Sequence, residues 1–596
     1  PLHRAAMWQA ARGGLTGDLL DDTVHPRPTA AAHAVRHLIR RLRPQLEELG
    51  DHAEVVSLAE TLLARGNSAD RQRAAFAERG ELDAVVKLVV DETHGPAAGP
   101  PPAAPALRTY RTRAGDEAVG PGSRPRPAYE KIVGHYEQLE PGVVGERMTA
   151  ARDWAASHDL AFRVDGELQP FAVDLVPRLI SGHEWRRISS GLVQRARALE
   201  AFLADVYGEQ RILQDGVIPR TDVEGAPGWH DAGREVPAGT VRAAVFGFDL
   251  VRTEFGSWRV LEDNLRNPSG AAYAVAIREL IDAVAPEVPR PEGLLDPGGV
   301  FGTLRSTLLA GGRRAASLSE DTAHQPAAAL LSSGPRSSAW FEHRVLAEGA
   351  GLDLLTLDDL AVHDGVVVHR EGGDRLHALY LRLDDELPEA RDGSGAPLGR
   401  AIMDVAAAGK VFLANAPGNG VADDKAVYCT VPSLIAYYLD ERPELEQVPT
   451  YRTSDEAERR AVLERVGELV TKPVDGHGGS GVLIGPAARA AEVAERRAAI
   501  AASPADWVAQ EVVALSSHPT FVRTEGAREA PAAAPGSPQH AVPWPVLEPR
   551  HVDLRVFVYA TGDGEFGLTV ADLALTRVAP AGSMVVNSSR GGGSKD

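Results

Sequence analysis

The sequence predicts an α/β (α+β) protein that begins with an all-helical segment. Residues 1–94 repeat apolar side chains at spacings of three and four, which is typical of amphipathic helices. From residue 127 onward, runs typical of helices alternate with runs typical of strands. The chain has 596 residues. At roughly 150 residues per domain, we expect about three to five structural units.

The composition argues against several classes of protein. A formal charge of −20 disfavours nucleic acid or an anionic membrane as the main partner, because both bind basic surfaces. The sequence has no run of about 18 apolar residues, so we expect no membrane span. It does not start with a basic segment followed by an apolar one, so we expect a cytoplasmic rather than a secreted protein. The single cysteine, Cys429, excludes an internal disulfide and a thiolate metal site, so any metal would have oxygen or imidazole ligands.

The N-terminal part divides into a helical segment and a linker. The helical runs AAAHAVRHLIRRLRPQLEEL and AEVVSLAETLLARG end at Gly50 and Gly66, as glycine commonly ends helices. Residues 95–126 are rich in Pro, Gly and Ala and have little periodicity, which predicts a linker. The chain starts without Met at PLHRAAMW and stops at RGGGSKD within a glycine-rich motif, so we expect both ends to continue in a longer chain.

The remaining chain, residues 127–596, reads as three consecutive parts. In 127–300, SSGLVQRARALEAFLADVYG predicts a helix, and VRAAVFGFDLVRT and SWRVLEDNL predict strands. In 301–400, the strand-like runs AAALLSS, GVVVHR and HALYLRL alternate with the helical run FEHRVLAEGAGL. In 401–596, LERVGELVTKPVDGHGGSGVLIGP predicts a helix, a strand, a glycine-rich loop and a strand. The Pro/Ala-rich residues 527–549 predict a surface loop.

A predicted hairpin, FGFDLVRTEFGSWRVLEDN, places two carboxylates face to face. A two-residue turn at Phe255 and Gly256 puts Asp249 opposite Glu262. Asn264 and Arg266 then share the face of Glu262, because side chains alternate along a strand. Opposed like charges destabilise a sheet unless a cation lies between them. This face therefore fits Mg²⁺ bound by carboxylate and amide oxygens. The alternative is a polar face that is simply solvated.

The hairpin ends in Pro-Ser-Gly, which predicts a tight turn where a substrate has access. A second constellation, VTKPVDGHGGSGVLIG, places Lys472 at a strand end before a glycine-rich loop. Backbone N–H groups of such a loop bind phosphate oxygens. The motif fits neither the P-loop nor the dinucleotide-binding fingerprint. An ordinary hairpin loop is the alternative, and the preceding lysine favours phosphate. The loop candidates are Gly476, Gly478, Gly479, Ser480 and Gly481.

Two further stretches carry polar groups suited to a nucleotide. In ANAPGNGVADDKAVY, Asp423 and Asp424 precede Lys425 at an expected helix start. The aspartates are alternatively helix caps, and Lys425 alternatively a surface lysine. The strand WVAQEVV carries Gln510 and Glu511, which suit an adenine edge or a ribose. The alternative is an ordinary buried strand that ends in polar residues.

The motifs that carry these groups resemble one known family. LEDNLRNPSG, FGFDLVRT, FLADVYGEQRIL, FEHRVLAEGAG, ANAPGNGVADDKAVY, TKPVDGHGGSGVLIG, AQEVV and NSSRGGGSKD are similar to motifs of the circularly permuted type 2 ATP-grasp proteins, relatives of glutathionylspermidine synthetase. The resemblance runs from about residue 127 to the C-terminus. It implies a circularly permuted ATP-grasp fold with a metal-binding part (127–300), an α/β part (301–400) and a nucleotide-binding part (401–596).

The resemblance also implies roles for individual residues. It implies ATP and Mg²⁺ as cofactors, with Arg266 holding an acceptor carboxylate or an acyl phosphate. Two departures from the family pattern are Asn267 before Pro268, from which we expect little effect, and Arg590 in place of a neutral polar residue. The implied Mg²⁺ ligands are Asp249, Glu262 and Asn264. The implied ATP-binding residues are Lys425, Lys472, the glycine loop, and an adenine hinge that contains Gln510, Glu511 and Val513. The implied catalytic residues are Arg266, Lys472 and Arg555.

The N-terminal segment resembles a different family. MWQAARGGLTGDLL and RGNSADRQRAAF are similar to the C-terminal part of type 2 glutamate–cysteine ligases, which are carboxylate–amine ligases. The catalytic sheet of that family would lie upstream, so no catalytic residue is assigned to residues 1–94. A generic helical adaptor is the alternative.

Both resemblances imply an ATP-dependent carboxylate–amine ligase that acts through an acyl phosphate. The implied partners are a small-molecule or peptide carboxylate, with a γ-glutamyl compound as one candidate, and an amine. Two alternatives use the same nucleotide site: a scaffold without turnover that docks a partner enzyme, and a kinase. The presence of all three metal-ligand candidates and both lysines favours an enzyme, because a decayed site is expected to lose some of them.

Overall fold

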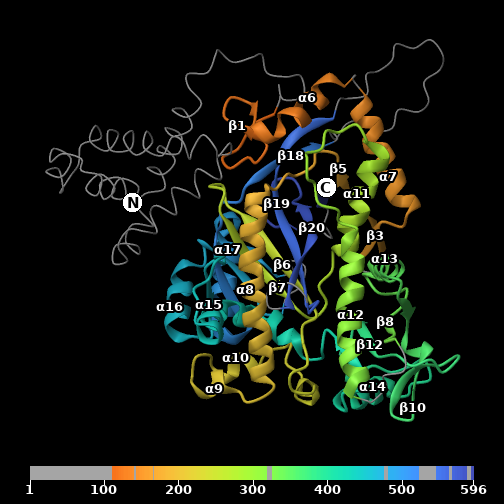
Figure 1. The fold of residues 1–596 in the computed structure, drawn as a ribbon. Coiled ribbons are helices and arrows are strands. Elements are labelled where there is room, and N and C mark those ends of the chain that lie inside the picture. Colours follow the sequence, from red (N-terminus) through yellow and green to blue (C-terminus); the bar gives the residue numbers. More distant parts are fainter. Residues whose placement is uncertain are drawn as a thin grey trace, which may run out of the picture.

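The computed structural model describes residues 110–139, 142–164, 167–318, 325–475, 481–522, 545–562, 567–586 and 592–596. The expected helical segment 1–94, most of the glycine-rich loop and Arg590 lie outside the described residues. Within the described part, helices and sheets are mixed along the chain, which confirms the predicted fold class (Figure 1). None of the helices described there is long and apolar enough to cross a membrane.

A seven-stranded sheet forms the centre of the molecule. Its order is β5-β21-β20-β19-β6-β7, and β18 pairs with β19. All neighbours are antiparallel except β21 and β5. Its strands are β5 (Val173–Asp174), β6 (Val245–Arg252), β7 (Trp258–Asn264), β18 (Ser517–Val522), β19 (Val546–Tyr559), β20 (Thr569–Val578) and β21 (Gly593–Lys595).

Helices cover both faces of this sheet because its strands alternate apolar side chains to either side. Phe557 and Leu575 point to one face and pack with α11 (Ala271–Val284) and α12 (Gly299–Leu318). Phe248 and Val556 point to the other face and pack with α8 (Gly182–Val206) and α15 (Lys425–Leu439). In Figure 1, α8 and α12 run along opposite sides of the sheet.

A second, parallel sheet lies beside the first (Figure 1). Its order is β13-β12-β8-β9. Its elements are β8 (Ala328–Ser332), α13 (Trp340–Ala350), β9 (Asp353–Leu355), the hairpin β10 (Leu360–His363) and β11 (Val366–His369), β12 (Ala378–Arg382), α14 (Leu398–Ala407) and β13 (Phe412–Ala414).

A small antiparallel sheet, in the order β14-β17-β15-β16, lies on the other side of the large one. It has a core of its own, formed by Val462, Val466, Leu469, Ile500 and Ala509. Its elements are β14 (Thr450–Arg452), α16 (Glu456–Arg465), β15 (Leu469–Pro473), β16 (Leu483–Ile484), α17 (Ala490–Ala502) and β17 (Trp507–Glu511). The predicted helix and both predicted strands are therefore present, and most of the loop between them lies outside the described residues.

The predicted hairpin is present, but its turn differs from the expectation. Arg252 pairs with Trp258, so the tip comprises residues 254–256 rather than Phe255 and Gly256 alone. A β-bulge beside Asp249 then shifts the register by one residue, at Leu261. The predicted pairing of Asp249 with Glu262 is confirmed, and the predicted two-residue turn was wrong.

Residues 110–126, which we expected within the linker, are part of the packed structure. They contain β1 (Val119–Gly120) and β2 (Arg124–Pro125), and Tyr110, Asp116 and Val119 are buried. The side-chain hydroxyl of Tyr110 donates to Asp116, which also accepts from the Val119 N–H. The packed region thus extends at least to residue 110.

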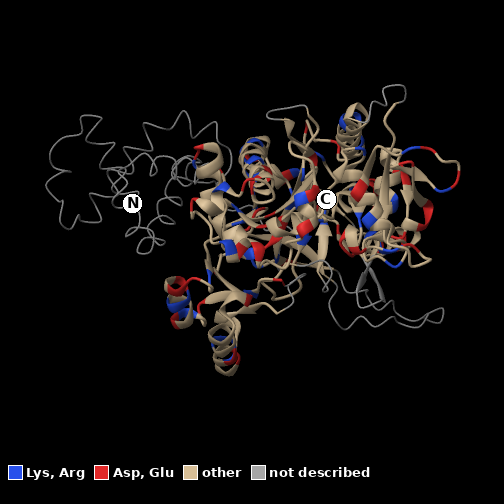
Figure 2. Cartoon of the chain, turned by 90° about the horizontal axis from the view of Figure 1, so that it is seen from below, with Lys and Arg blue, Asp and Glu red and all other residues tan. Residues whose placement is uncertain are grey.

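The remaining short elements surround these sheets. They are α6 (Glu130–Gln138), α7 (Val143–Ser157), β3 (Ala161–Val164), β4 (Glu167–Pro170), α9 (Arg211–Gln214) and α10 (Arg220–Glu224). Basic and acidic residues are interspersed along these elements and the rest of the ribbon (Figure 2).

Candidate functional site

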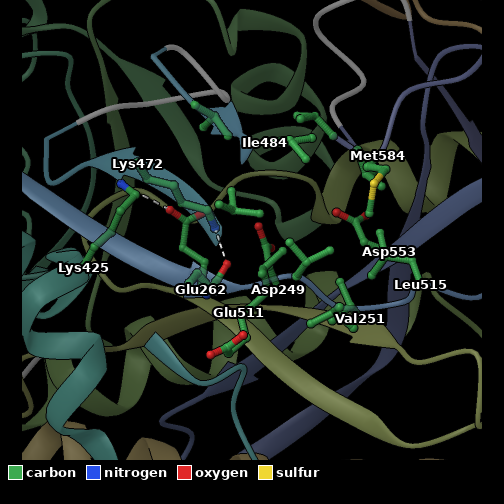
Figure 3. Close-up of a pocket in the computed structure, with 18 of the residues that line it drawn as sticks. Asp249, Val251, Glu262, Lys425, Lys472, Ile484, Glu511, Leu515, Asp553 and Met584 are labelled. Atoms are coloured by element: carbon green, nitrogen blue, oxygen red, sulfur yellow. Dashed lines mark hydrogen bonds and ion pairs between the residues drawn. The ribbon is translucent and has the colours of Figure 1, made fainter. Parts of the chain in front are cut away.

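A cavity of about 400 Å³ lies between the large sheet and the small sheet. This volume is within the range of small-molecule sites, roughly 300–1,000 Å³. Its charged and polar lining residues are Asp249, Glu262, Asn264, Lys425, Lys472, Gln510, Glu511, Asp553, Arg555 and Arg577. Its apolar lining residues include Val470, Val482, Ile484, Val512, Val513, Leu515 and Met584. In Figure 3, Lys425, Lys472 and Glu262 lie on one side of the cavity, and Met584 and Asp553 lie on the other.

Asp249 is buried on β6 and held by two arginines. Arg555 of β19 donates to both carboxylate oxygens, from Nε at 2.5 Å and from Nη2 at 2.8 Å. Arg577 of β20 donates to Oδ2 at 2.8 Å. Burial alone would raise the pKa of Asp249, but the two positive charges outweigh it and hold the pKa well below its usual range. Asp249 is therefore ionised in the folded protein.

Arg577 also binds Asp553, so the cluster extends across two strands. Its Nη2 lies 2.6 Å from Oδ2 of Asp553, which is directly opposite Arg577 in the β19–β20 pair. The sequence reasoning did not identify Asp553 or Arg577. The available signal was the presence of charged residues within two apolar strands, VDLRVFVY with Asp553 and LALTRV with Arg577. A charge in a buried strand needs a partner, and these two residues partner each other.

Glu262 and Asn264 lie on the same face as Asp249, as the strand alternation predicts. The carboxylate of Glu262 is directly opposite Asp249 in the hairpin, and its side chain is 36% exposed. Asn264 donates from Nδ2 to the carbonyl of Gly247 at 3.4 Å. Between them on β7, Asp263 points to the opposite face, where Arg195 binds it at 2.6 Å. The structure thus brings all three expected metal ligands to the cavity.

The two lysines approach from the side of the small sheet. Nζ of Lys472, on β15, donates to Oε1 of Gln510 at 2.7 Å. Burial lowers the pKa of Lys472 to about 8, against the opposing effect of Glu262. Nζ of Lys425, at the start of α15, donates to the carbonyl of Val474 at 3.2 Å and lies 3.6 Å from Oε1 of Glu262. Both expected phosphate-binding lysines therefore line one cavity with the carboxylate hairpin.

Helix α15 presents Lys425 because Asp424 caps it. The carboxylate of Asp424 accepts from the N–H of Ala426 at 2.7 Å. Asp423 has a different partner: its carboxylate accepts from the N–H groups of Leu265 and Arg266, just past the end of β7. Burial raises the pKa of Asp423 to about 7. One aspartate thus caps the helix as the alternative interpretation stated, and the other joins the helix start to the hairpin.

Arg266 does not line the cavity. Strand β7 ends at Asn264, so side-chain alternation no longer applies two residues later. The Arg266 guanidinium lies 2.9 Å from Glu386 through Nε and donates from Nη2 to the carbonyl of Asp384 at 3.0 Å. The expectation that Arg266 shares the face of Glu262 was therefore wrong.

The three residues expected in an adenine hinge, Gln510, Glu511 and Val513, all line the cavity. Gln510 is buried and accepts a hydrogen bond from Lys472. The carboxylate of Glu511 is engaged elsewhere, because it accepts from Tyr451 at 2.6 Å and pairs with Arg465 at 3.0 Å. Gly481 has a φ of +71°, which glycine adopts without strain. Gly476, Gly478, Gly479 and Ser480 lie outside the described residues.

The oxygen atoms on the hairpin fit Mg²⁺ in their chemistry. Oδ1 of Asp249 accepts one hydrogen bond, so it retains a lone pair for a cation. Within the described residues, no group of three or more His, Cys, Asp or Glu side chains is suited to a metal. An ion here would depend on Asp249, Glu262 and Asn264 together with oxygens of a ligand. Mg²⁺ commonly binds in this way, through one or two carboxylates and substrate phosphates.

Comparison with known proteins identifies the family. Residues 177–579 match the family model described as circularly permuted ATP-grasp type 2. A protein of Frankia alni named "Putative glutamate--cysteine ligase 2-3" is 43% identical over 613 residues, which cover 100% of this chain and 68% of that protein. A protein of Synechocystis sp. named "Uncharacterized protein sll0335" is 38% identical over 495 residues, 81% of this chain and 96% of that protein.

Among solved structures, a glutathione synthetase-like effector from Globodera pallida in its apo form is similar at 12% identity. The TM-score is 0.48, and the match covers 77% of this chain and 98% of that one. The family match covers more than half of the chain, and the Frankia alni protein is similar over the whole of it. The chain therefore belongs to the circularly permuted ATP-grasp type 2 family.

Proposed function

We propose that this chain is an ATP-dependent carboxylate–amine ligase that acts through an acyl phosphate and uses Mg-ATP. The observation that carries the proposal is the cavity between the two sheets. It combines a hairpin with two carboxylates and an amide, two lysines opposite, two arginines beside Asp249, and an apolar wall. Family membership supports the use of ATP by a ligase in general.

In the proposed reaction, a carboxylate oxygen of the acid attacks the γ-phosphorus of ATP, and ADP leaves. The amine nitrogen then attacks the acyl carbon, phosphate leaves, and the amine loses a proton as the amide forms. Negative charge on the transferring phosphoryl group is stabilised by fixed positive charges. No side chain of the protein has to act as a nucleophile.

The proposed roles follow from where each group lies. Lys425 and Lys472 bind ATP phosphates, and Arg555 and Arg577 face the phosphoryl group from the large sheet. Val512, Val513 and Met584 contact the adenine through the apolar wall. Asp249, Glu262 and Asn264 would hold Mg²⁺, which when bound supplies further positive charge at the phosphate oxygens.

The substrate class is an acid and an amine. The Frankia alni relative bears a name that refers to glutamate and cysteine. We propose an amino acid or a γ-glutamyl peptide as the acid, which agrees with that name and with the resemblance of the N-terminal segment. Arg266 lies outside the cavity, so it would bind the acid substrate only where that substrate extends past the end of β7.

The test is ADP release with Mg-ATP and panels of amino acids, γ-glutamyl peptides and amines, with product identification by mass spectrometry. Glu262→Ala should reduce turnover by about 100-fold or more, in the range seen when one charge-stabilising group is removed. The matched control is Glu446→Ala, because Glu446 pairs with Arg259 on the outside of the same hairpin and its side chain is 71% exposed.

The products distinguish the proposal from its alternatives. An amide formed together with ADP supports the ligase. A stable phosphorylated product without amide would identify a kinase instead. ATP binding without ADP release for any acid and amine would identify a scaffold. Undiminished turnover in Glu262→Ala would contradict the metal assignment.

A further inference from the structure

The Pro268-Ser269-Gly270 turn connects the metal-ligand strand β7 to helix α11, and two arginines bind it from different sides. One is Arg555, which also holds Asp249 in the cavity. The other is Arg382, at the end of β12 in the parallel sheet. The turn therefore lies between the cavity and a part of the molecule that does not line it.

Arg382 and Glu342 form a buried ion pair that binds the turn through its backbone. Nη2 of Arg382 lies 3.0 Å from Oε2 of Glu342, and the two side chains are 1% and 0% exposed. Nη1 of Arg382 donates to the carbonyl of Pro268 at 2.7 Å, and Nη2 donates to Oγ of Ser269 at 2.5 Å. Oε1 of Glu342 accepts from the N–H of Gly270 at 2.6 Å. All three residues of the turn are thus bound by one ion pair.

The other side of the turn fixes Arg555. Nη1 of Arg555 donates to the carbonyl of Ser269 at 2.9 Å, while Nε and Nη2 of the same guanidinium bind the two oxygens of Asp249. Because a guanidinium is planar and rigid, the position of the Ser269 carbonyl determines the plane in which Asp249 is held.

The space around the turn is tight enough to transmit its position. A Cβ on Gly247, in β6, would lie 2.8 Å from Cβ of Pro268. A Cβ on Gly270 would lie 2.9 Å from Leu575 and 3.7 Å from Cδ of Arg555. The turn therefore packs directly on β6, which carries Asp249, and on β19 and β20, which carry Arg555 and Arg577. This close packing leaves no room for the turn to shift.

We propose that the Glu342–Arg382 ion pair positions the metal-binding carboxylate: it fixes the turn, the turn fixes Arg555, and Arg555 sets the orientation in which Asp249 binds Mg²⁺. This inference rests on the proposed function of the cavity. Neither Glu342 nor Arg382 lines the cavity, so both are positioning residues rather than catalytic residues. The arrangement also gives the Pro-Ser-Gly turn a role that its sequence alone did not indicate.

The experiment measures how ATP binding depends on Mg²⁺, by calorimetric titration of the full chain. The main variant is Glu342→Leu/Arg382→Met, which replaces the pair by apolar side chains of similar size; such replacements often leave folding intact. The Mg²⁺ concentration for half-maximal enhancement of ATP binding should rise about 10–100-fold, as for other groups that orient metal ligands. Affinity for ATP without Mg²⁺ should change by less than about 3-fold, because the lysines and the apolar wall are unchanged.

A second variant keeps the test decisive if the first one does not fold. Arg382→Lys retains the buried charge but lacks the fork that binds Pro268, Ser269 and Glu342 together. It should raise the required Mg²⁺ concentration in the same direction. The matched control is Asp174→Leu/Lys595→Met, a buried ion pair of the same large sheet that contacts the backbone of Val176, Pro519 and Phe521 rather than the turn. It should lower thermal stability and leave the Mg²⁺ dependence unchanged.

The outcomes separate this inference from the proposed function. Mg²⁺-dependent ATP binding by the wild type, with an unchanged Mg²⁺ requirement in a folded variant of Arg382, would overturn the inference alone. An equal rise in the required Mg²⁺ concentration in the control variant would also overturn the inference, because the loss of any buried ion pair would then have the same effect. Absence of Mg²⁺-dependent ATP binding in the wild type would overturn the proposed function, and the inference with it.

Discussion

The two walls of the cavity hold their charges in opposite ways. On the large sheet, Asp249 lies within a cluster of ion pairs with Arg555 and Arg577. On the small sheet, Lys472 donates to the neutral amide oxygen of Gln510. On the large sheet the opposite charges neutralise one another, whereas on the small sheet a partly buried cation is bound to an uncharged group.

The pKa values of the two groups express this difference. Asp249 is buried and Lys472 is partly buried, and loss of contact with water disfavours the charged form of each. For Asp249 the two arginines outweigh burial, and the pKa falls. For Lys472 burial is the larger effect, and the pKa falls to about 8. The shift favours the charged form of Asp249 and the neutral form of Lys472. The charges of the large sheet are therefore balanced without a ligand, and in the proposed function the phosphates of ATP would supply the anion beside Lys472.

The largest expected effect concerns the large sheet, where Asp249 is paired with two arginines. Asp249→Ala should lower the free energy of unfolding by about 3–5 kcal/mol, because Arg555 would lose its carboxylate partner in a buried site. Glu262→Ala is the matched variant on the opposing strand. It should cost about 1 kcal/mol or less, because Glu262 is partly exposed and its pair with Lys425 is long. Urea unfolding at pH 7 measures both. Equal losses would show that the two carboxylates are held alike.

The second prediction concerns the small sheet, where Lys472 contacts the uncharged amide of Gln510. ATP affinity should fall by about 2-fold from pH 7 to pH 8 and by about 5-fold more from pH 8 to pH 9, because only the protonated form of Lys472, whose pKa is about 8, attracts phosphate. Binding titrations across pH 7–9 measure this slope. Lys472→Arg is the control, since a guanidinium stays charged throughout this range. The same slope in Lys472→Arg would assign the titration to another group.

The contents of the cavity were predictable from sequence where a single element places them. Asp249, Glu262 and Asn264 meet because neighbouring strands alternate their side chains. The predicted turn was one residue too short, and the bulge at Leu261 compensates for it. A bulge has no signature in LEDN, so the correct pairing did not follow from the correct turn. The expectation for Arg266 failed because alternation ends where the strand ends.

Residues that depend on distant strand pairing could not be predicted in this way. Arg555, which only the family resemblance indicated, and Arg577, which was not predicted at all, reach Asp249 across the pairings of β6 with β19 and β19 with β20. Periodicity shows which face of its own strand a residue occupies, but not which strand lies beside it. The buried residues 110–126 illustrate the same limit: a Pro/Gly-rich composition predicted a linker, and tertiary contacts bury part of it.

The smallest expected effect concerns the cap of helix α15, which positions Lys425 beside the cavity. Asp424→Ala removes the cap of α15 and should cost about 1 kcal/mol of stability, because the N–H of Ala426 loses its partner. ATP affinity should fall by less than about 3-fold, since fraying of the first turn moves Lys425 but retains its charge. Asp424→Asn is the control, because asparagine caps helices equally well without a charge. Thermal unfolding and ATP titration together separate the two cases. A loss in Asp424→Asn as large as in Asp424→Ala would show that the charge of Asp424, rather than its cap, supports this side of the cavity.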